Sequence, residues 1–154
     1  MSKTCVLVLD NIRSVENTGS IFRTAEGLGV SRVYLVGTTP APLDRFGRKR
    51  SDFTKVSLGA ESLEWEYKGD VVEVIKELKS QDFKIISIEQ HPKANKLRSQ
   101  EADKLCLIVG NEVDGVSKVA LEMSDEIVEI EMKGKKESLN VSVATGIALF
   151  KLLE

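Results

Sequence analysis

The sequence predicts an α/β fold in which a mostly parallel sheet carries helices on both faces. Short apolar runs alternate along the chain with segments of helical periodicity. Strands buried on both faces read as continuous apolar runs, and Cys5–Leu9 and Leu105–Val109 have this composition. About six strands separated by helices favour parallel crossover connections.

The expected elements can be given in chain order. Strands are expected at residues 5–9, 33–36, 83–88, 105–109 and 125–132. Helices are expected after residue 19, ending near Leu28 before Gly29, and at residues 71–79, 118–123 and 139–153. A Pro-containing loop covers residues 37–50, and the region around Trp65 favours no single element.

Length and composition limit the classes of protein that fit. A chain of 154 residues is expected to form one domain over residues 1–154, large enough for a full core. The net charge of −2 gives no overall basic field. Cys5 and Cys106 lie in apolar runs, and without a signal peptide or a long apolar span we expect reduced thiols in a cytoplasmic protein. His91 is the only histidine, so no metal site is expected.

The C-terminal helix, residues 139–153, is apolar on almost every side. A helix without a polar face must be buried all round, although chain ends normally lie in solvent. The helix is therefore expected to sit in the protein's own core or against a partner subunit. Its small residues would let another backbone approach closely: Ser142, Ala144, Thr145, Gly146 and Ala148.

A basic loop precedes this helix. Three lysines surround Gly134, and Ser138 is a natural N-cap whose helical first turn could bind an anion. The alternative is a capped helix after a solvated basic turn. Asn140 stands in an otherwise apolar run, where an unpartnered amide is costly, so we expect a specific partner for it.

Two further loops follow expected strands. The first carries Asn17, Gly19 and, on the following helix, Arg23. Asn17 could instead be a helix N-cap, and Arg23 a solvated surface charge. The second loop, Gly110–Ser117, places glycines around an acidic residue. Ligands bind beyond the carboxyl ends of parallel strands, so the three loops are expected to form one site.

The three loops together resemble the SpoU (TrmH-type) RNA 2′-O-ribose methyltransferases of the SPOUT superfamily. The motifs are Asn17-x-Gly-x-x-x-Arg23, Gly110-Asn-Glu112-x-x-Gly, and Ile-x-Met-x-Gly-x-x-x-Ser-Leu-Asn-Val-Ser-Val-Ala, which ends at Ala144. The resemblance runs from about Cys5 to Leu153, essentially the whole chain. One departure is Glu131, where the family commonly has proline.

The resemblance implies a deep C-terminal trefoil knot, which is an exception to the rule of unknotted connections. In the family, the tail builds an S-adenosylmethionine pocket and helps to form a homodimer. By similarity, the cofactor contacts fall at Ile88, Gly110, Ile130 and Leu139. The reaction site would comprise Asn17, Arg23, Glu112, Ser138 and Asn140.

The resemblance also implies how RNA is captured and modified. We expect no N-terminal RNA-binding extension of the kind that some relatives carry, so phosphate contacts are expected from Arg45, Arg48, Lys49, Arg50, Lys133, Lys135 and Lys136. The expected substrate is tRNA first and rRNA second. Arg23 is the general base in family models. A guanidinium stays protonated at any pH below about 12, so Arg23 could instead stabilise the developing alkoxide.

Two other classes of protein remain as alternatives. A non-catalytic RNA-binding member of the same fold is disfavoured because the five reaction-site residues are retained. A nucleotide-binding α/β enzyme could use Gly110–Gly115 as a phosphate loop. This is disfavoured because neither a Gly-x-Gly-x-x-Gly nor a Walker lysine pattern occurs.

Overall fold

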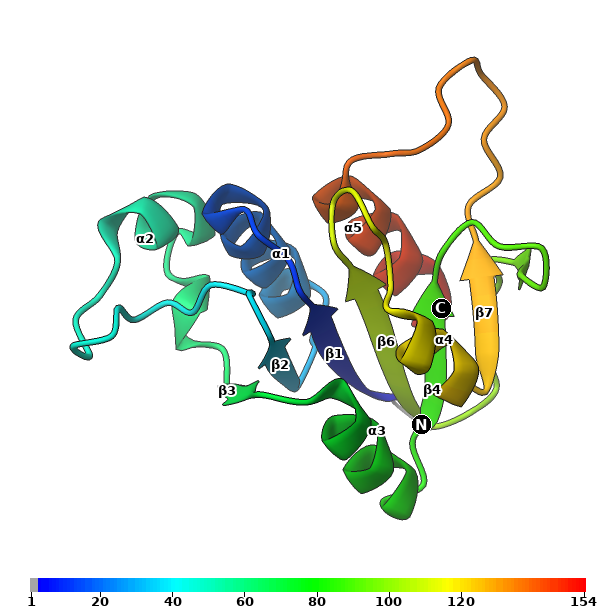
Figure 1. Cartoon of the computed structure of the whole chain (residues 1–154), viewed down its shortest axis with the longest axis horizontal. Coiled ribbons are helices and arrows are strands. Elements are labelled where there is room, and N and C mark those ends of the chain that lie inside the picture. Colours follow the sequence, from blue (N-terminus) through cyan, green and yellow to red (C-terminus); the bar gives the residue numbers. More distant parts are fainter. Residues whose placement is uncertain (1–2) are drawn as a thin grey trace.

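The computed structural model describes residues 3–154, in which a seven-stranded sheet runs through the centre (Figure 1). Every strand pairing is parallel, as expected from the sequence, and the strand order is β3-β2-β1-β6-β4-β7-β5. The strands are β1 (Thr4–Asp10), β2 (Arg32–Val36), β3 (Trp65–Lys68), β4 (Lys84–Ile88), β5 (Asn95–Lys96), β6 (Lys104–Gly110) and β7 (Glu126–Glu129).

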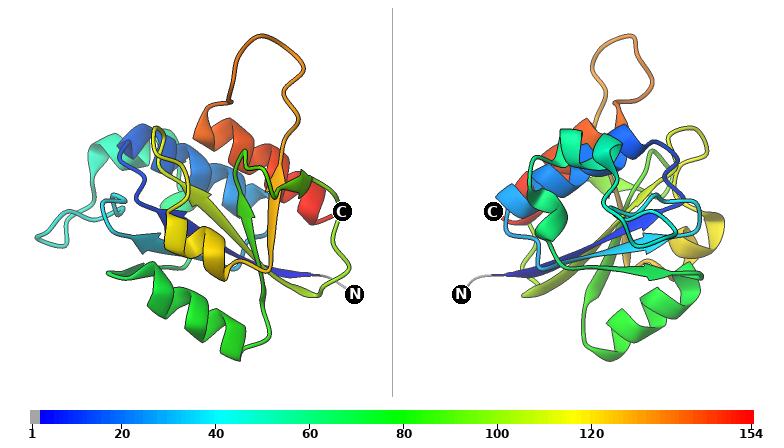
Figure 2. Two further views of the ribbon diagram at one scale, coloured as in Figure 1. Left: turned by 45° about the vertical axis from the view of Figure 1, so that its right-hand side comes forward. Right: turned by 90° about the vertical axis from the view of Figure 1, so that its left-hand side faces the viewer.

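Helices cover both faces of the sheet, which confirms the layered α/β architecture (Figure 2). Those packed on one face are α1 (Val15–Gly27), α2 (Ser51–Ser57) and α5 (Val141–Leu152), with a short 3₁₀ helix at Ala60–Ser62. Those packed on the other face are α3 (Val71–Ser80) and α4 (Lys118–Met123). None of the helices in residues 3–154 is long and apolar enough to cross a membrane.

Strand β1 shows why the sheet needs helices on both sides. Leu7 and Leu9 face the core beneath α1 and α5, while Val6 and Val8 face the core beneath α3. Alternate residues of a strand point to opposite faces, so an uninterrupted apolar strand requires two apolar partners. Burial also raises the pKa of the Cys5 thiol to about 12, which keeps it protonated.

Helices α1 and α2 pack closely through a glycine. A Cβ at Gly19 would lie 3.1 Å from the Cβ of Val56 and 3.2 Å from the carbonyl oxygen of Phe53. Beside this contact the rings of Phe22 and Phe53 meet edge to face, with centroids 5.0 Å apart and an interplanar angle of 88°. Gly19 in the first motif therefore serves helix packing.

Several expected boundaries were wrong. The last strand ends at Glu129 because Ile130 and Met132 leave the sheet to line a cavity. Seven strands form instead of about six, since the Trp65 region becomes β3 and Asn95–Lys96 adds an edge strand. The C-terminal helix begins at Val141. The trefoil knot stays a prediction.

The protein's own core does not bury the C-terminal helix on all sides, so that part of the expectation is wrong. Ala148, Leu149 and Leu152 are buried against the sheet. By contrast, Val143, Ile147 and Phe150 are 51%, 43% and 64% exposed. The α5 helix thus keeps an apolar side that the protein's own core does not cover.

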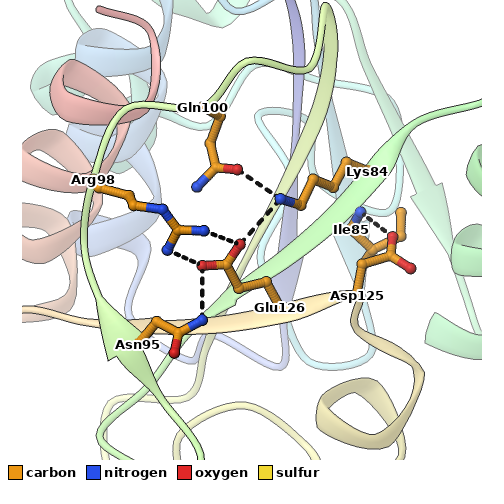
Figure 3. A network of polar contacts seen from close by, with 7 residues as sticks. All are labelled: Lys84, Ile85, Asn95, Arg98, Gln100, Asp125 and Glu126. Carbon is orange, nitrogen blue, oxygen red and sulfur yellow. Dashed lines mark hydrogen bonds and ion pairs between the residues drawn. The ribbon is translucent and has the colours of Figure 1, made fainter.

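A buried carboxylate holds the edge of the sheet together (Figure 3). Glu126, at the start of β7, accepts hydrogen bonds from Lys84 Nζ at 3.0 Å, from Asn95 Nδ2 at 3.2 Å and from both terminal nitrogens of Arg98. Burial raises the pKa of Glu126, but the hydrogen bonds from Lys84, Arg98 and Asn95 outweigh burial and hold this pKa below its ordinary value. The cluster ties the chain after β5 to β4 and β7.

We expect Glu126→Gln to lower the free energy of unfolding by about 1–3 kcal/mol at neutral pH, because the two cations lose their ionised acceptor. The folded-state pKa is depressed, so this stabilisation is present above the unfolded pKa of about 4.3 and is lost as the pH falls through the folded-state pKa. Thermal unfolding over a pH series should show wild type and variant converging in acid. Glu131→Gln is the control, since the exposed Glu131 lies 3.6 Å from an exposed lysine; an equal loss in both variants would contradict the role of Glu126.

Candidate cofactor and reaction site

A cavity of about 700 Å³ lies beyond the carboxyl ends of β4 and β6. The four expected cofactor-binding residues all line it: Ile88, Gly110, Ile130 and Leu139. Four of the five expected reaction-site residues line it as well: Asn17, Glu112, Ser138 and Asn140. The sequence motifs therefore converge on one cavity, while the role of each residue stays a prediction.

Backbone packing shapes the floor of the cavity at the end of β6. A Cβ at Gly110 would lie 2.2 Å from the carbonyl carbon of Gly115 and from the nitrogen of Val116. The loop closes on itself, because Asn111 and Gly115 exchange two backbone hydrogen bonds of 3.0 and 2.9 Å. Gly115 has φ +72°, a conformation that favours glycine. The second motif thus supplies a preformed backbone wall.

Glu89 is a site residue that the sequence analysis missed. It follows β4 directly, and its Oε2 accepts a hydrogen bond of 2.8 Å from the nitrogen of Val116. A Cβ at Gly115 would lie 1.9 Å from this oxygen, so the carboxylate needs a glycine there. The only signal in the sequence was an acidic residue at the end of an apolar strand. Glu89 fastens the Gly110–Ser117 loop to the neighbouring strand.

Glu112 joins the second motif to the first. Its carboxylate accepts hydrogen bonds from the backbone nitrogens of Arg13 and Ser14, at 3.0 and 2.9 Å, and from Asn17 Nδ2 at 3.0 Å. Burial raises the pKa of Glu112, but these hydrogen bonds outweigh it and leave the pKa below its ordinary value. An ionised carboxylate at the N-terminus of α1 is also favoured by the helix dipole. Glu112 therefore orients Asn17.

Asn140 joins the third motif to the first. Its Nδ2 donates to Asn17 Oδ1 at 3.3 Å, which confirms that Asn140 has a specific partner. Its Oδ1 accepts from the backbone nitrogens of Ser142 and Val143, so Asn140 is the N-cap of α5. Glu112, Asn17 and Asn140 thus form one hydrogen-bonded chain across three loops.

Two expected helix caps were wrong. Ser138 does not cap α5, because the helix begins three residues later and Asn140 supplies the capping oxygen. Asn17 does not cap α1, since Ser14 Oγ accepts a hydrogen bond of 3.0 Å from the Asn17 nitrogen. The capping alternative for Asn17 therefore falls, and its side chain is free to bind Glu112 and Asn140.

Arg23 is the expected reaction-site residue that this chain does not bring to the cavity. It is exposed on α1, six residues beyond Asn17, and is not among the cavity-lining residues. The expected phosphate contacts are also mostly exposed and fall in two loops, Arg45 to Arg50 after β2 and Lys133 to Lys136 before α5. No group of three or more His, Cys, Asp or Glu side chains suited to a metal occurs within residues 3–154.

Comparison with known proteins shows the family. The family described as "SpoU rRNA Methylase family" matches residues 4–150, so the chain belongs to it. The 23S rRNA (guanosine-2′-O-)-methyltransferase RlmB of Escherichia coli K12 is 31% identical over 147 residues, which is 95% of this chain and 58% of that protein. The RlmB of Neisseria meningitidis serogroup B is 31% identical over 145 residues, covering 94% of this chain and 56% of that protein.

Solved structures share the fold. A TrmH/SpoU tRNA modifying enzyme of A. aeolicus matches with a TM-score of 0.83 and 28% identity, over 97% of this chain and 73% of that one. An AdoMet-bound rRNA methyltransferase of Sinorhizobium meliloti matches with a TM-score of 0.86 and 23% identity, over 98% and 56% respectively. The chain spans less than two thirds of the length of the curated relatives that it matches.

We expect Asn140→Ala to lower the free energy of unfolding by about 1 kcal/mol, because α5 loses its capping oxygen. Asn140→Asp keeps that oxygen at the helix N-terminus and should stay within a few tenths of a kcal/mol of wild type. Ser138→Ala is the matched control and should not change the melting temperature. Thermal denaturation of the three variants measures this; destabilisation by Ser138→Ala alone would show that Ser138 is the cap.

Proposed function

We propose that the chain transfers a methyl group from S-adenosylmethionine to a ribose 2′-hydroxyl of RNA, with rRNA favoured over tRNA. The observation that carries this is the hydrogen-bonded chain from Glu112 through Asn17 to Asn140 at the rim of the cavity. It places three polar side chains from three separate motifs beside walls suited to a cofactor. Membership of the SpoU family supports the reaction class.

The residues that line the cavity suit S-adenosylmethionine in their chemistry. Ile88, Ile130 and Leu139 give it apolar walls, while the ends of β4 and β6 present backbone polar groups. Such pockets hold an apolar ring between side chains and read its polar edge with backbone groups. When bound, the cofactor supplies an electrophilic methyl group on a sulfonium centre. The relative from Sinorhizobium meliloti is described as AdoMet-bound, which supports this assignment.

The residues at the rim would position the ribose and stabilise charge. Glu112 fixes the amide of Asn17 through Nδ2, and Asn140 holds its Oδ1, so the amide cannot rotate freely. As the 2′-oxygen would bond to the methyl carbon, the carbon–sulfur bond of the cofactor would break and the hydroxyl proton would pass to water. A guanidinium is a donor and not a base, so the suited role of Arg23 is to stabilise the developing negative oxygen or an adjoining phosphate.

The choice between rRNA and tRNA rests on the relatives, and it reverses the order expected from the sequence. The curated relatives modify a guanosine of 23S rRNA, as their names state. A tRNA modifying enzyme is also among the structural relatives, at 28% identity. We therefore place rRNA first and tRNA second, with the two basic loops as the phosphate contacts.

We also propose that the chain forms a homodimer through α5. Val143, Ile147 and Phe150 present an apolar side that one chain leaves exposed. The residue next to Arg23 packs near this helix, since a Cβ at Gly146 would lie 3.3 Å from Thr24 Cγ2. A second copy that packs on this side of α5 would therefore lie close to Arg23.

We expect Phe150→Glu to convert a dimer into a monomer, because it replaces the most exposed residue on the apolar side of α5 with a charge. Sedimentation equilibrium at micromolar concentration measures the change. Leu58→Glu is the matched control, since Leu58 is 63% exposed and lies at the end of α2. A wild-type monomer, or a dimer that survives in Phe150→Glu, would rule out this interface.

The function is tested with purified protein, labelled S-adenosylmethionine, and rRNA or tRNA free of modification. We expect label in a ribose 2′-O-methyl group of rRNA, located by mapping. Arg23→Ala should reduce single-turnover transfer about a hundredfold, while cofactor binding measured by calorimetry stays unchanged. Label in neither RNA would reject the proposal, and near-normal transfer by Arg23→Ala would reject the role of Arg23 alone.

A further inference from the structure

The loop after β2 contains a small, rigid hairpin at residues 42–50. Leu43 and Lys49 pair across it, and the Asp44 nitrogen donates to the Arg48 carbonyl at 2.8 Å. The Asp44 carboxylate accepts from the Phe46 nitrogen at 2.8 Å and from the backbone and side chain of Arg48, each at 3.0 Å. Gly47 makes the turn with φ +77°. One carboxylate thus fixes the tip of the hairpin.

An exposed aromatic ring stands at this tip. Phe46 is 67% exposed, the largest exposed fraction of any aromatic residue among residues 3–154. The guanidinium carbons of Arg45 and Arg48 lie 4.9 and 5.0 Å from the centre of its ring. Neither the core nor the apolar side of α5 includes this residue. The hairpin therefore holds an apolar ring in water among positive charges.

This combination selects the kind of partner. A positive surface attracts phosphates, while an exposed aromatic face stacks on nucleobases whatever their sequence. A protein partner with an apolar surface would gain little from two cations beside its contact. In a duplex the base faces are already stacked, so only an unpaired base can offer a free face.

We propose that Phe46 stacks on an unpaired base of the RNA substrate, with Arg45 and Arg48 contacting its phosphates. This inference rests on the proposed function, since it assumes that the partner is RNA. It adds a substrate class: an RNA with an unpaired nucleotide a short distance from the ribose that is methylated.

The position of the hairpin agrees with such a path. It follows the carboxyl end of β2, at the edge of the sheet where the cavity opens, and the loop projects from the body of the protein (Figure 1). Three strand steps separate β2 from β4, or about 15 Å. A second cavity of about 420 Å³ lies between them and is lined in part by Arg13 and Lys118, together with Asp10 and Asp114. Polar side chains, with charges of both signs, thus line the way from the hairpin to the reaction site.

The experiment measures binding of a short single-stranded RNA that carries 2-aminopurine, and of the same sequence as a full duplex. Phe46→Leu should weaken single-strand binding about tenfold and abolish the fluorescence quench of 2-aminopurine, with the salt dependence unchanged. Phe46→Trp should retain both the affinity and the quench. Lys49→Gln should affect the salt dependence instead. It should reduce the slope of log affinity against log salt by about 0.7, and it should leave the fluorescence quench unchanged.

The controls separate this inference from the proposed function. Tyr67→Leu removes another exposed aromatic ring, on β3, and should leave single-strand binding unchanged. The stacking proposal would be overturned if Phe46→Leu kept the affinity and the quench of the wild type. It would also be overturned if Phe46→Leu weakened duplex binding as much as single-strand binding, even if methyl transfer proceeds. If the wild type binds and quenches the RNA but transfers no methyl group, the proposed function fails and the stacking proposal stands. No RNA binding by the wild type would overturn both.

Discussion

The parallel pairing of β1 with β6 sets the geometry at the functional edge of the sheet. The two strands pair in register from Thr4 opposite Lys104 to Asp10 opposite Gly110. Their following loops therefore leave the sheet at the same level, and Glu112 can reach the start of α1. A slip of one residue would exchange the faces of every side chain in the strand and displace the loop by about 3.3 Å. Close packing on both faces opposes that slip, because side chains of different size would exchange places.

Carboxylates hold the loops of the site in place, and they do so mainly by accepting backbone hydrogen bonds. Glu89 accepts from Val116, and Glu112 accepts from the first turn of α1 and from Asn17. Ionised carboxylates accept several hydrogen bonds at once, and those to charged acceptors are the stronger ones. Glu126 at the far end of β7 differs, because two cations neutralise it. The loops around the cavity are thus anchored without drawing on the cations that RNA would need.

The sequence predicted the sheet and the convergence of the three loops, which follow from apolar periodicity and from the rule that carboxyl ends of parallel strands meet at one edge. The individual cofactor and reaction-site residues came from the resemblance to the SpoU family, and all of them except Arg23 line the cavity. It did not predict which polar residue would cap each helix. Ser138 and Asn140 are both good caps, and only the contact of Asn140 with Asn17 decides between them. Phe46 could not be predicted for a similar reason: an isolated phenylalanine in a basic loop gives no sign of whether it is buried or held exposed.

The proposed RNA recognition must rest on local features because of the net charge of the chain. With a net charge of −2, the protein offers no long-range attraction to a polyanion, and surface charges act only within about 8 Å at physiological salt. Phosphate contacts from two short basic loops give modest, sequence-independent affinity under these conditions. A contact that does not weaken with salt then contributes a larger share of binding, and base stacking is such a contact. A hydrogen-bonded hairpin with an exposed ring would therefore serve the proposed function well, because the overall field of the chain is slightly repulsive to RNA.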